Sequence, residues 1–507
     1  MSEKETLGFK KEEGAETDIE KTLEMLEKAA EKGDEESMMR LARHFETGDG
    51  VSIDLDKAHS LYIHAFHLPF DNPSDEYHGP ENNEMMMTVF ERMASKGHAL
   101  SMLTLGRCYD KGIGVAQDKK KAFELFMKSA DNGNAKAMCN VGSCFDNGDG
   151  VIQDKRKAFE WYLKSAEHGN DDGMYNAASC YDNGEGVRQN KAKAFEWYLK
   201  SAEKGNDYGM FNLALCYKNG EGVTKDMTKA FEWYLKAAEK GDTDSMFSVG
   251  LCFKNGEGVT QDLVKAFEWF LKSAEKGDAA GMLNVGLCYF NGEGVTEDLE
   301  KAFEWFLKSA EDGNAEAMNH VGVCYFEGEG VTKDKAKAFE WYLKSAENGD
   351  AEGMYNVGMC YNKGQGVAQN KKEAFKWFLE SAENEDEDAM FLVGLCYSKG
   401  KGVKQNEKKG FKWFLKSAEN GNTAAMFNLG LSYRHGLGVA QNEKKSFKWF
   451  LKSAEDGDAD AMLNVGWCYL HGFGVSRDLV NAQEWLTQAA NNGCEEAEQQ
   501  LELLSQN

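Results

Sequence analysis

Residues 134–169 read NAKAMCNVGSCFDNGDGVIQDKRKAFEWYLKSAEHG, and this stretch decides the fold of the 507-residue chain. Its first half places Met138, Val141, Gly142 and Phe145 at i, i+3, i+4 and i+7, which is the spacing of one helical face. We call the segment that carries them helix A. A helix with one apolar stripe must bury that stripe against a second element.

A second helix, helix B, follows a turn that contains glycine. Gly148 and Gly150 interrupt the helical pattern, and Asp154 stands where a side-chain oxygen can cap the next helix. Gly169 ends that helix, because glycine readily adopts the positive φ of a helix C-terminus. The apolar face of helix B consists of Ala158, Trp161, Tyr162, Ser165 and Ala166. The stretch is therefore predicted to form a helical hairpin.

The hairpin returns every 36 residues along most of the chain. Twelve full copies are marked by the first core methionine of helix A: Met38, Met102, Met138, Met174, Met210, Met246, Met282, Met318, Met354, Met390, Met426 and Met462. One hairpin cannot enclose its own aromatic residues, so neighbouring copies must stack on one another. The sequence therefore predicts an all-α fold, an α/α solenoid of antiparallel helix pairs.

The domain organisation follows from where the repeat begins, is interrupted and ends. Residues 1–17 are expected to be a flexible tail, and residues 18–493 one solenoid that opens with a lone B-type helix, capped by Asp18, as a lid. The first two core methionines are 64 residues apart, which reveals an irregular insertion at residues 67–83. Residues 494–507 begin another helix A with polar residues at core positions, and are expected to be a capping helix and tail.

Composition limits the partners and the location. The formal net charge of −26 argues against a nucleic-acid backbone as the main partner, and favours either simple solubility or basic partners. The N-terminal residues lack the apolar core of a signal peptide, and no stretch is apolar enough to cross a bilayer. We therefore expect no nucleic-acid partner, no membrane span and a cytoplasmic location, with an undetermined oligomeric state.

Most cysteines occupy one position of helix A. Ten of the 12 are Cys108, Cys144, Cys180, Cys216, Cys252, Cys288, Cys324, Cys360, Cys396 and Cys468. Equivalent positions of stacked hairpins lie about 10 Å apart, the packing distance of neighbouring helices, whereas bridged Cα atoms lie within about 7 Å. We therefore interpret these cysteines as reduced, buried core residues. The sequence contains no CxxC motif and no Cys/His pair with zinc spacing.

Four histidines flank or enter the insertion: His59, His64, His67 and His78. His64 and His67 stand about one helical turn apart, close in sequence to Asp71 and Asp75, so a metal-dependent hydrolase is an alternative hypothesis. These residues do not supply a tetrahedral ligand set, and no pair has the local context of nucleophilic catalysis. The sequence therefore predicts a protein without enzymatic activity, cofactor or metal ion.

Helix A carries the better candidate for a binding site. Asparagine recurs just before the core Val or Leu position, at Asn140, Asn176, Asn212, Asn284, Asn356, Asn428 and Asn464. The preceding residue is aromatic in several copies: Tyr175, Phe211, Phe247, Tyr355, Phe391 and Phe427. A row of amides offers donors and acceptors to a peptide backbone, and the aromatic residues offer apolar contact area. The same asparagines can instead bond to the backbone of the adjacent repeat, and the sequence does not decide between the two.

Two rows of charge change sign along the repeat. Helix B carries Glu124, Glu160, Glu196, Glu232, Glu268, Glu304 and Glu340 at one position, and then Lys376, Lys412 and Lys448. The residue between the turn glycines changes from Asp149, Glu185, Glu221, Glu257, Glu293 and Glu329 to Gln365 and Lys401. We hypothesise that the acidic rows steer a basic partner, while common ancestry of the repeats explains the same pattern without one.

Helix B also carries an apolar pair outside its core face, Phe159 and Leu163, with equivalents such as Phe195 in the next copy. In the last full copy the pair becomes Gln483 and Thr487. Because polarity appears where a neighbouring hairpin is lost, we expect the pair to pack between repeats.

The segments AMCNVGSCFDNGDGV and DKRKAFEWYLKSAEHG, with their copies from Met102 to Gly493, closely resemble the Sel-1-like repeat family, relatives of tetratricopeptide repeat proteins. The resemblance covers most of the chain and implies a right-handed superhelix whose A helices line the concave face. It also implies adaptor or scaffold work in signalling, protein quality control or host–microbe contact. The cysteine-rich bacterial members have a disulfide within each repeat, but helix B contains no partner cysteine in this chain. Their penicillin binding therefore does not carry over.

Together, these observations predict a non-enzymatic interaction scaffold or adaptor. Its concave helix-A face, with the asparagine row and the flanking aromatic residues, is expected to bind an extended peptide or a partner helix. The alternatives from other classes are the metal-dependent hydrolase that uses the insertion's histidines and a purely structural, self-assembling rod.

Overall fold

The computed structural model describes residues 13–68 and 83–505, and these residues form 27 α-helices and no strand. Twelve copies of helix A are α2 (Glu35–Thr47), α5 (Ala99–Lys111), α7 (Ala135–Asn147), α9 (Asp171–Asn183), α11 (Asp207–Asn219), α13 (Thr243–Asn255), α15 (Ala279–Asn291), α17 (Ala315–Glu327), α19 (Ala351–Lys363), α21 (Glu387–Lys399), α23 (Thr423–His435) and α25 (Ala459–His471). Twelve copies of helix B are α3 (Leu55–Ala65), α6 (Lys119–Asp131), α8 (Lys155–Glu167), α10 (Lys191–Glu203), α12 (Met227–Glu239), α14 (Leu263–Glu275), α16 (Leu299–Glu311), α18 (Lys335–Glu347), α20 (Lys371–Glu383), α22 (Glu407–Glu419), α24 (Glu443–Glu455) and α26 (Leu479–Asn491). Three further helices are α1 (Glu13–Ala30), α4 (Asn83–Ser95) and α27 (Glu495–Ser505). The all-α prediction is confirmed.

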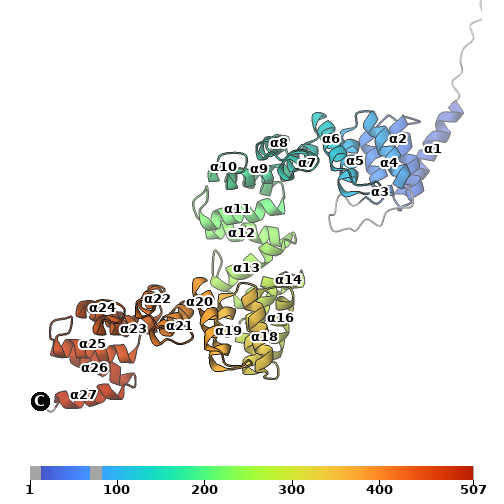
Figure 1. Cartoon of the computed structure of the whole chain (residues 1–507). Helices are drawn as coiled ribbons and strands as arrows, with labels where there is room; N and C mark the ends of the chain where they lie inside the picture. The colour runs from blue at the N-terminus through green and yellow to red at the C-terminus, as the bar shows by residue number, and fades with distance from the viewer. Residues whose placement is uncertain (1–12, 69–82, 506–507) are drawn as a thin grey trace, which may run out of the picture. The chain divides into compact units, whose positions relative to one another are not determined.

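The chain divides into two compact units, with the boundary in α13. The first unit runs to Ser245 and includes the turn Glu257–Val259, and the second contains Met246–Gly256 and the residues from Thr260 onward. Within a unit, each helix B packs against helix A of its own hairpin and helix A of the next, as α7, α8 and α9 show (Figure 1). This is the solenoid stacking that the 36-residue period predicts. The handedness of the superhelix stays a prediction.

The α7–α8 hairpin shows why each helix begins and ends where it does. The Asn134 side chain accepts a hydrogen bond from the backbone of the first turn of α7 at 2.9 Å. Asp154 does the same for α8, accepting from the N–H groups of Arg156 and Lys157 at 3.1 Å. Such caps stabilise a helix by about 1 kcal/mol each. Gly148 ends α7 with φ 81°, a conformation that favours glycine.

The second turn glycine joins neighbouring hairpins. Gly150 has φ 69°, and a Cβ atom there would lie 2.2 Å from the carbonyl oxygen of Lys119 in the preceding helix B. Gly186 has the same relation to Lys155, at 2.0 Å. Only a hydrogen atom fits between the two backbones, so the recurring G-x-G pattern is explained by stacking rather than by a ligand.

The core of the hairpin matches the predicted helical faces with one exception. Val141 is fully buried and Tyr162 is 5% exposed. A Cβ atom at Gly142 would lie 2.6 Å from the Tyr162 ring, so this glycine lets the two helices approach closely. Trp161 was expected in the core but is only half-buried, and the Lys164 ammonium group lies 4.2 Å from its ring centre. The indole ring therefore covers the core from the outside.

The second apolar strip of helix B packs between repeats, as predicted. The Phe159 ring is buried and contacts Tyr181 of the next hairpin edge-on, with 5.0 Å between ring centroids. Phe195 makes the same contact with Tyr217 at 5.4 Å.

The N-terminal helix differs from the expectation. α1 begins at Glu13, so Asp18 lies inside the helix rather than at its N-cap, and residues 13–17 are helical rather than part of a tail. Residues 13–17 include Glu13, Ala15 and Glu16, and Glu and Ala are strong helix formers, so the helix extends past the expected cap despite Gly14. Residues 1–12 of the expected tail lie outside the described residues. Leu23 is buried, as the lid role requires.

The C-terminal helix α27 covers the last hairpin. Leu501 and Leu504 pack against its core. Glu498 and Gln499 are exposed, which agrees with a polar cap.

The predicted insertion ends in α4, a helix that is tied to α2 by a buried ion cluster. Glu46 is 1% exposed, and its carboxylate accepts hydrogen bonds from Arg92 at 2.6 and 2.7 Å, Lys96 at 3.0 Å and the Tyr62 hydroxyl at 3.2 Å. Burial alone would raise the pKa of Glu46, but the Arg92 and Lys96 bonds outweigh it and lower that pKa to about 2. Residues 69–82 of the insertion lie outside the described residues.

Candidate functional site

The asparagine row lies on helix A in both units, and its amides are half-buried except for Asn464, which is 8% exposed. In four copies the side chain bonds to its own helix. Asn212, Asn284, Asn428 and Asn464 donate from Nδ2 to the carbonyl oxygen one turn earlier, at 2.9, 3.0, 2.8 and 2.7 Å. Because the donor nitrogen turns back to the helix, the side-chain carbonyl oxygen of the three half-buried copies is the group that a ligand can reach.

Two other asparagines bond to the preceding repeat. Asn176 donates to the Cys139 sulfur at 3.4 Å, and Asn356 donates to the Asn319 side-chain oxygen at 2.9 Å. Bonding to the backbone of the adjacent repeat was one of the two alternatives for these asparagines. In these two copies the bond reaches a side chain of that repeat instead.

The aromatic residues beside the asparagines form half-buried rings, each of which packs on the core aromatic ring of helix B in the same hairpin. The pairs and their centroid distances are Tyr175–Tyr198 6.0 Å, Phe211–Tyr234 5.7 Å, Phe247–Phe270 5.7 Å, Tyr355–Phe378 6.1 Å, Phe391–Phe414 5.8 Å and Phe427–Phe450 5.7 Å. Tyr208, which is 64% exposed, lies 5.6 Å from the Tyr175 ring and extends the strip in the first unit. The helix-A face therefore presents fixed aromatic surface in each unit.

A row of carboxylates on the same face was missed by the sequence analysis. It lies one helical turn before the asparagine position, on residues that are exposed: Asp172, Asp244, Glu316, Glu352, Asp388 and Asp460. Two of these carboxylates already accept a hydrogen bond from an asparagine of the next repeat, Asp172 from Asn206 at 2.9 Å and Asp388 from Asn422 at 2.7 Å. Residues four apart share a helical face, so these carboxylates flank the asparagine row. The 36-residue spacing of these acids was visible in the sequence and is the signal that would have found them. The face is consequently rich in hydrogen-bond acceptors and negative charge.

The predicted charge rows separate into an exposed row and a paired row. The Glu and Lys residues of the helix-B row are all exposed, as the steering hypothesis requires. Four of the six turn acids are instead bound to lysines of the preceding repeat, in the ion pairs Lys119–Asp149 3.5 Å, Lys155–Glu185 3.1 Å, Lys191–Glu221 2.8 Å and Lys254–Glu293 3.2 Å. Since a neighbouring cation offsets the charge of each of these four acids, they contribute less to a free field than the helix-B row does.

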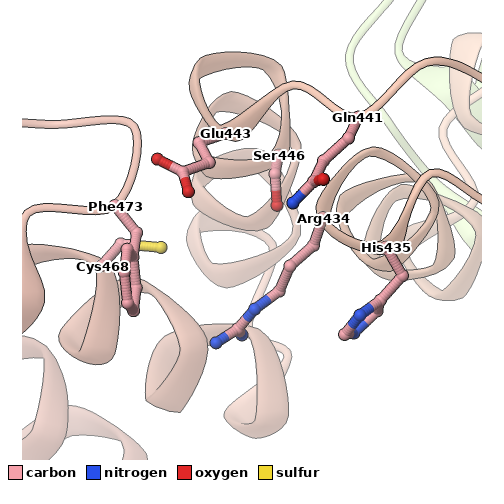
Figure 2. Close-up of a pocket in the computed structure, with 7 residues that line it drawn as sticks. All are labelled: Arg434, His435, Gln441, Glu443, Ser446, Cys468 and Phe473. Carbon is pink, nitrogen blue, oxygen red and sulfur yellow. The ribbon is translucent and has the colours of Figure 1, made fainter.

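Near the C-terminal end of the second unit, a pocket of about 230 Å³ takes the place of the ion pair between a turn acid and the preceding repeat. Figure 2 shows its seven lining residues, Arg434, His435, Gln441, Glu443, Ser446, Cys468 and Phe473. Arg434 stands at the position of Asp146 and Glu443 at the position of Lys155, so both charges are reversed relative to that earlier repeat. Phe473 stands at the position of the turn acid Glu185. Arg434 donates to the Asn464 side-chain oxygen at 2.7 Å, and its guanidinium carbon lies 5.9 Å from the Phe473 ring centre.

The pocket lacks an activated nucleophile. Burial raises the pKa of the Cys468 thiol to about 11, so this thiol stays protonated at neutral pH. The pocket can hold a small polar group or a side chain of a partner.

The histidines of the alternative hypothesis have separate partners. His59 Nε2 lies 2.9 Å from the Thr104 hydroxyl, His64 Nδ1 lies 2.8 Å from the Ser60 carbonyl oxygen, and His67 Nε2 lies 2.8 Å from Glu35. Within residues 13–68 and 83–505, no three His, Cys, Asp or Glu side chains are grouped to hold a metal ion. His78, Asp71 and Asp75 lie outside the described residues.

The periodic cysteines lie in the core, as predicted. Nine of the ten are buried, and Cys396 is half-buried. Burial raises the pKa of the Cys108 thiol to about 12 and of the Cys288 thiol to about 11. The reduced state of the ten thiols stays a prediction.

Comparison with known proteins decides the family. The Sel1 repeat model matches thirteen segments, which are residues 7–34, 35–65, 99–134, 135–170, 171–206, 207–242, 243–278, 279–314, 315–350, 351–386, 387–422, 423–458 and 459–494. The chain belongs to the Sel1 repeat family. The twelve predicted full copies and the lid helix coincide with these thirteen matches, and residues 66–98, which contain the insertion and α4, are unmatched.

Two solved structures are similar to this chain. A protective antigen of uropathogenic Escherichia coli strains with an SLR fold is 35% identical, covers 83% of this chain and 90% of its own, and superposes with a TM-score of 0.63. A Sel1 repeat protein from Oxalobacter formigenes is 28% identical over 61% of this chain and 90% of its own, with a TM-score of 0.49. Among curated proteins, the comparison finds no match.

Membership in the family indicates a general role. Sel1 repeats, like the related tetratricopeptide repeats, commonly serve as protein-interaction scaffolds, and the family is generally non-enzymatic. In the described part of the chain, no helix is long and apolar enough to cross a membrane.

Proposed function

We propose that this Sel1 repeat protein is a cytoplasmic scaffold whose helix-A face binds a basic peptide or a partner helix. The observation that carries the proposal is the acceptor-rich strip on helix A. Exposed carboxylates such as Glu352 stand one turn before the asparagine row, and the amide nitrogens of Asn212, Asn284 and Asn428 are already bonded to their own helix. A ligand on this face must therefore bring hydrogen-bond donors and positive charge.

The aromatic residues give the same face its apolar contact. Their rings are held by the helix-B rings beneath them, so binding orders few new side-chain rotamers, and preorganised surface of this kind favours affinity. A partner that combines Lys or Arg with apolar residues fits both features. In this proposal the charge of the whole chain assists diffusional encounter, and the helix-A face makes the short-range contacts.

Site-specific photo-crosslinking in the cells that make the protein tests the proposal. A photo-crosslinking residue replaces Asn284 or Phe391 on the helix-A face, and matched controls carry it in place of Glu268 or Glu304, which are exposed on helix B of the same unit. We expect cross-links to other proteins from the helix-A positions only. Cross-links from the helix-B positions alone, or exclusively to further copies of this chain, would overturn the proposal.

A further inference from the structure

The second unit carries a compact patch of lysine on the outer side of three consecutive B helices. We call it the basic ridge, and it consists of Lys372 and Lys376 on α20, Lys408 and Lys412 on α22, and Lys444 and Lys448 on α24. All six side chains are exposed. Each helix contributes two lysines four residues apart, which share one helical face.

The ridge lysines differ from the other lysines of the same helices. Lys409 and Lys445 lie over the rings of Tyr397 and Tyr433, and their ammonium groups are therefore engaged with the protein. Among the ridge lysines in the described structure, only Lys376 has an ion pair, with Glu373 of its own helix at 2.8 Å. The remaining ammonium groups of the ridge are left to solvent.

The ridge has defined ends. At the position of Lys376, Lys412 and Lys448, the preceding repeat carries Glu340 and the following repeat carries Glu484. At this position, positive charge is thus confined to three repeats of a chain whose net charge is −26. A long polyanion that continued along the solenoid would run into these glutamates, whereas a short acidic segment would end before them.

The spacing of the ridge indicates the form of the ligand. Lysines four residues apart on one helix stand about 6 Å apart along its axis, from the 1.5 Å rise per residue. Successive B helices are joined through the helix A that packs between them, as α21 packs against both α20 and α22. The three lysine pairs therefore lie on separate helices, and a short segment with several carboxylates can contact more than one pair.

We propose that the basic ridge binds a short acidic segment of another protein. This surface is separate from the helix-A face, because it lies on helix B and requires the opposite charge. The molecule would then join a basic partner on one face to an acidic partner on the other.

The test uses the full-length protein and a labelled, alanine-based helical peptide. The peptide carries pairs of glutamates four residues apart, and the pairs repeat every seven residues. Binding is measured by fluorescence anisotropy at low ionic strength, where screening is weak. The triple variant Lys376→Glu, Lys412→Glu and Lys448→Glu copies the residues of the earlier repeats, so the fold tolerates the change. We expect this variant to bind at least about tenfold more weakly, since three attractive contacts become repulsive.

A gain-of-binding variant supplies the matched control. The changes Glu268→Lys, Glu304→Lys and Glu340→Lys extend the ridge onto α14, α16 and α18, and should strengthen binding. Equal binding by wild type and the loss variant, or by the peptide with glutamine in place of glutamate, would overturn the proposal. It would also be overturned if a short oligothymidylate bound more tightly than the peptide, or if self-association that requires the ridge lysines blocked the peptide.

Discussion

The two turn glycines of each repeat offer a matched test of how the hairpins are joined. Gly148 and Gly150 both have positive φ, 81° and 69°. Replacing either by alanine forces an L-residue into the left-handed region, at a cost of about 1–2 kcal/mol. At Gly148 the new Cβ atom would meet its nearest neighbour at 3.4 Å, which is an ordinary contact.

Gly150→Ala carries an additional cost. Its Cβ atom would lie 2.2 Å from the backbone oxygen of Lys119, and backbone cannot rotate away as a side chain can. The hairpin of α5 and α6 and the hairpin of α7 and α8 must therefore move apart by roughly 1 Å. Overpacking of this kind costs about 1–3 kcal/mol. We expect Gly150→Ala to lose about 2–5 kcal/mol in total and Gly148→Ala about 1–2 kcal/mol.

Hydrogen exchange of the full chain, followed by mass spectrometry, measures the difference where it arises. A difference of 1–3 kcal/mol corresponds to roughly 5- to 150-fold faster exchange in α6 to α8 for Gly150→Ala than for Gly148→Ala. Repeats far from the change should exchange alike in both variants, because each hairpin contacts only its neighbours. Equal exchange in α6 to α8 would refute the close approach of the two backbones.

Three further predictions concern Glu46, the cysteines and a turn ion pair. Glu46→Gln should destabilise the N-terminal end by about 3 kcal/mol at neutral pH. Because the pKa of Glu46 is depressed, the stability that it contributes in the wild type is present above pH ~4.5 and is lost as the pH falls toward 2. Urea unfolding of both proteins at several pH values measures this contribution. Alkylation of the native protein should label the half-buried Cys494 well before the buried periodic thiols such as Cys108, which quantitative mass spectrometry would detect. Glu185→Gln should change the unfolding free energy by less than about 1 kcal/mol, because its ion pair with Lys155 is exposed. A larger loss of stability in calorimetry would show that the turn ion pairs contribute substantially to the packing of neighbouring repeats.

The fold could be predicted from the sequence because the same pattern of residues recurs in every repeat. Met138 and Val141 define one face of helix A, and the glycines and Asp154 fix the turn, so twelve copies of the hairpin confirm one another. The start of α1 could not be predicted, because an acceptable cap residue, Asp18, lies inside a longer helix that begins at Glu13. The cluster around Glu46 was also missed, since its charged partners, Arg92 and Lys96, come from α4, which has no counterpart in the repeat.

The candidate site was only partly readable. The sequence placed the asparagines and aromatic residues on helix A, but not the direction of each amide. Asn284 turns its nitrogen to its own helix while Asn356 reaches the preceding repeat, and this choice depends on whether Asn319 stands opposite. The pairing of Lys155 with both Asp146 and Glu185 depends on the stacking of two repeats, which no single repeat reveals.

The most direct test of the proposed scaffold function measures the affinity of a cross-linked partner for two variants of the second unit. One variant changes Asn284, Asn356 and Asn428 to Leu on the helix-A face, and the other changes Lys376, Lys412 and Lys448 to Ala on helix B. We predict that a basic partner captured from the helix-A face binds the first variant at least about tenfold more weakly and the second with unchanged affinity. Unchanged binding to the asparagine variant, with a loss confined to the lysine variant, would contradict the proposal.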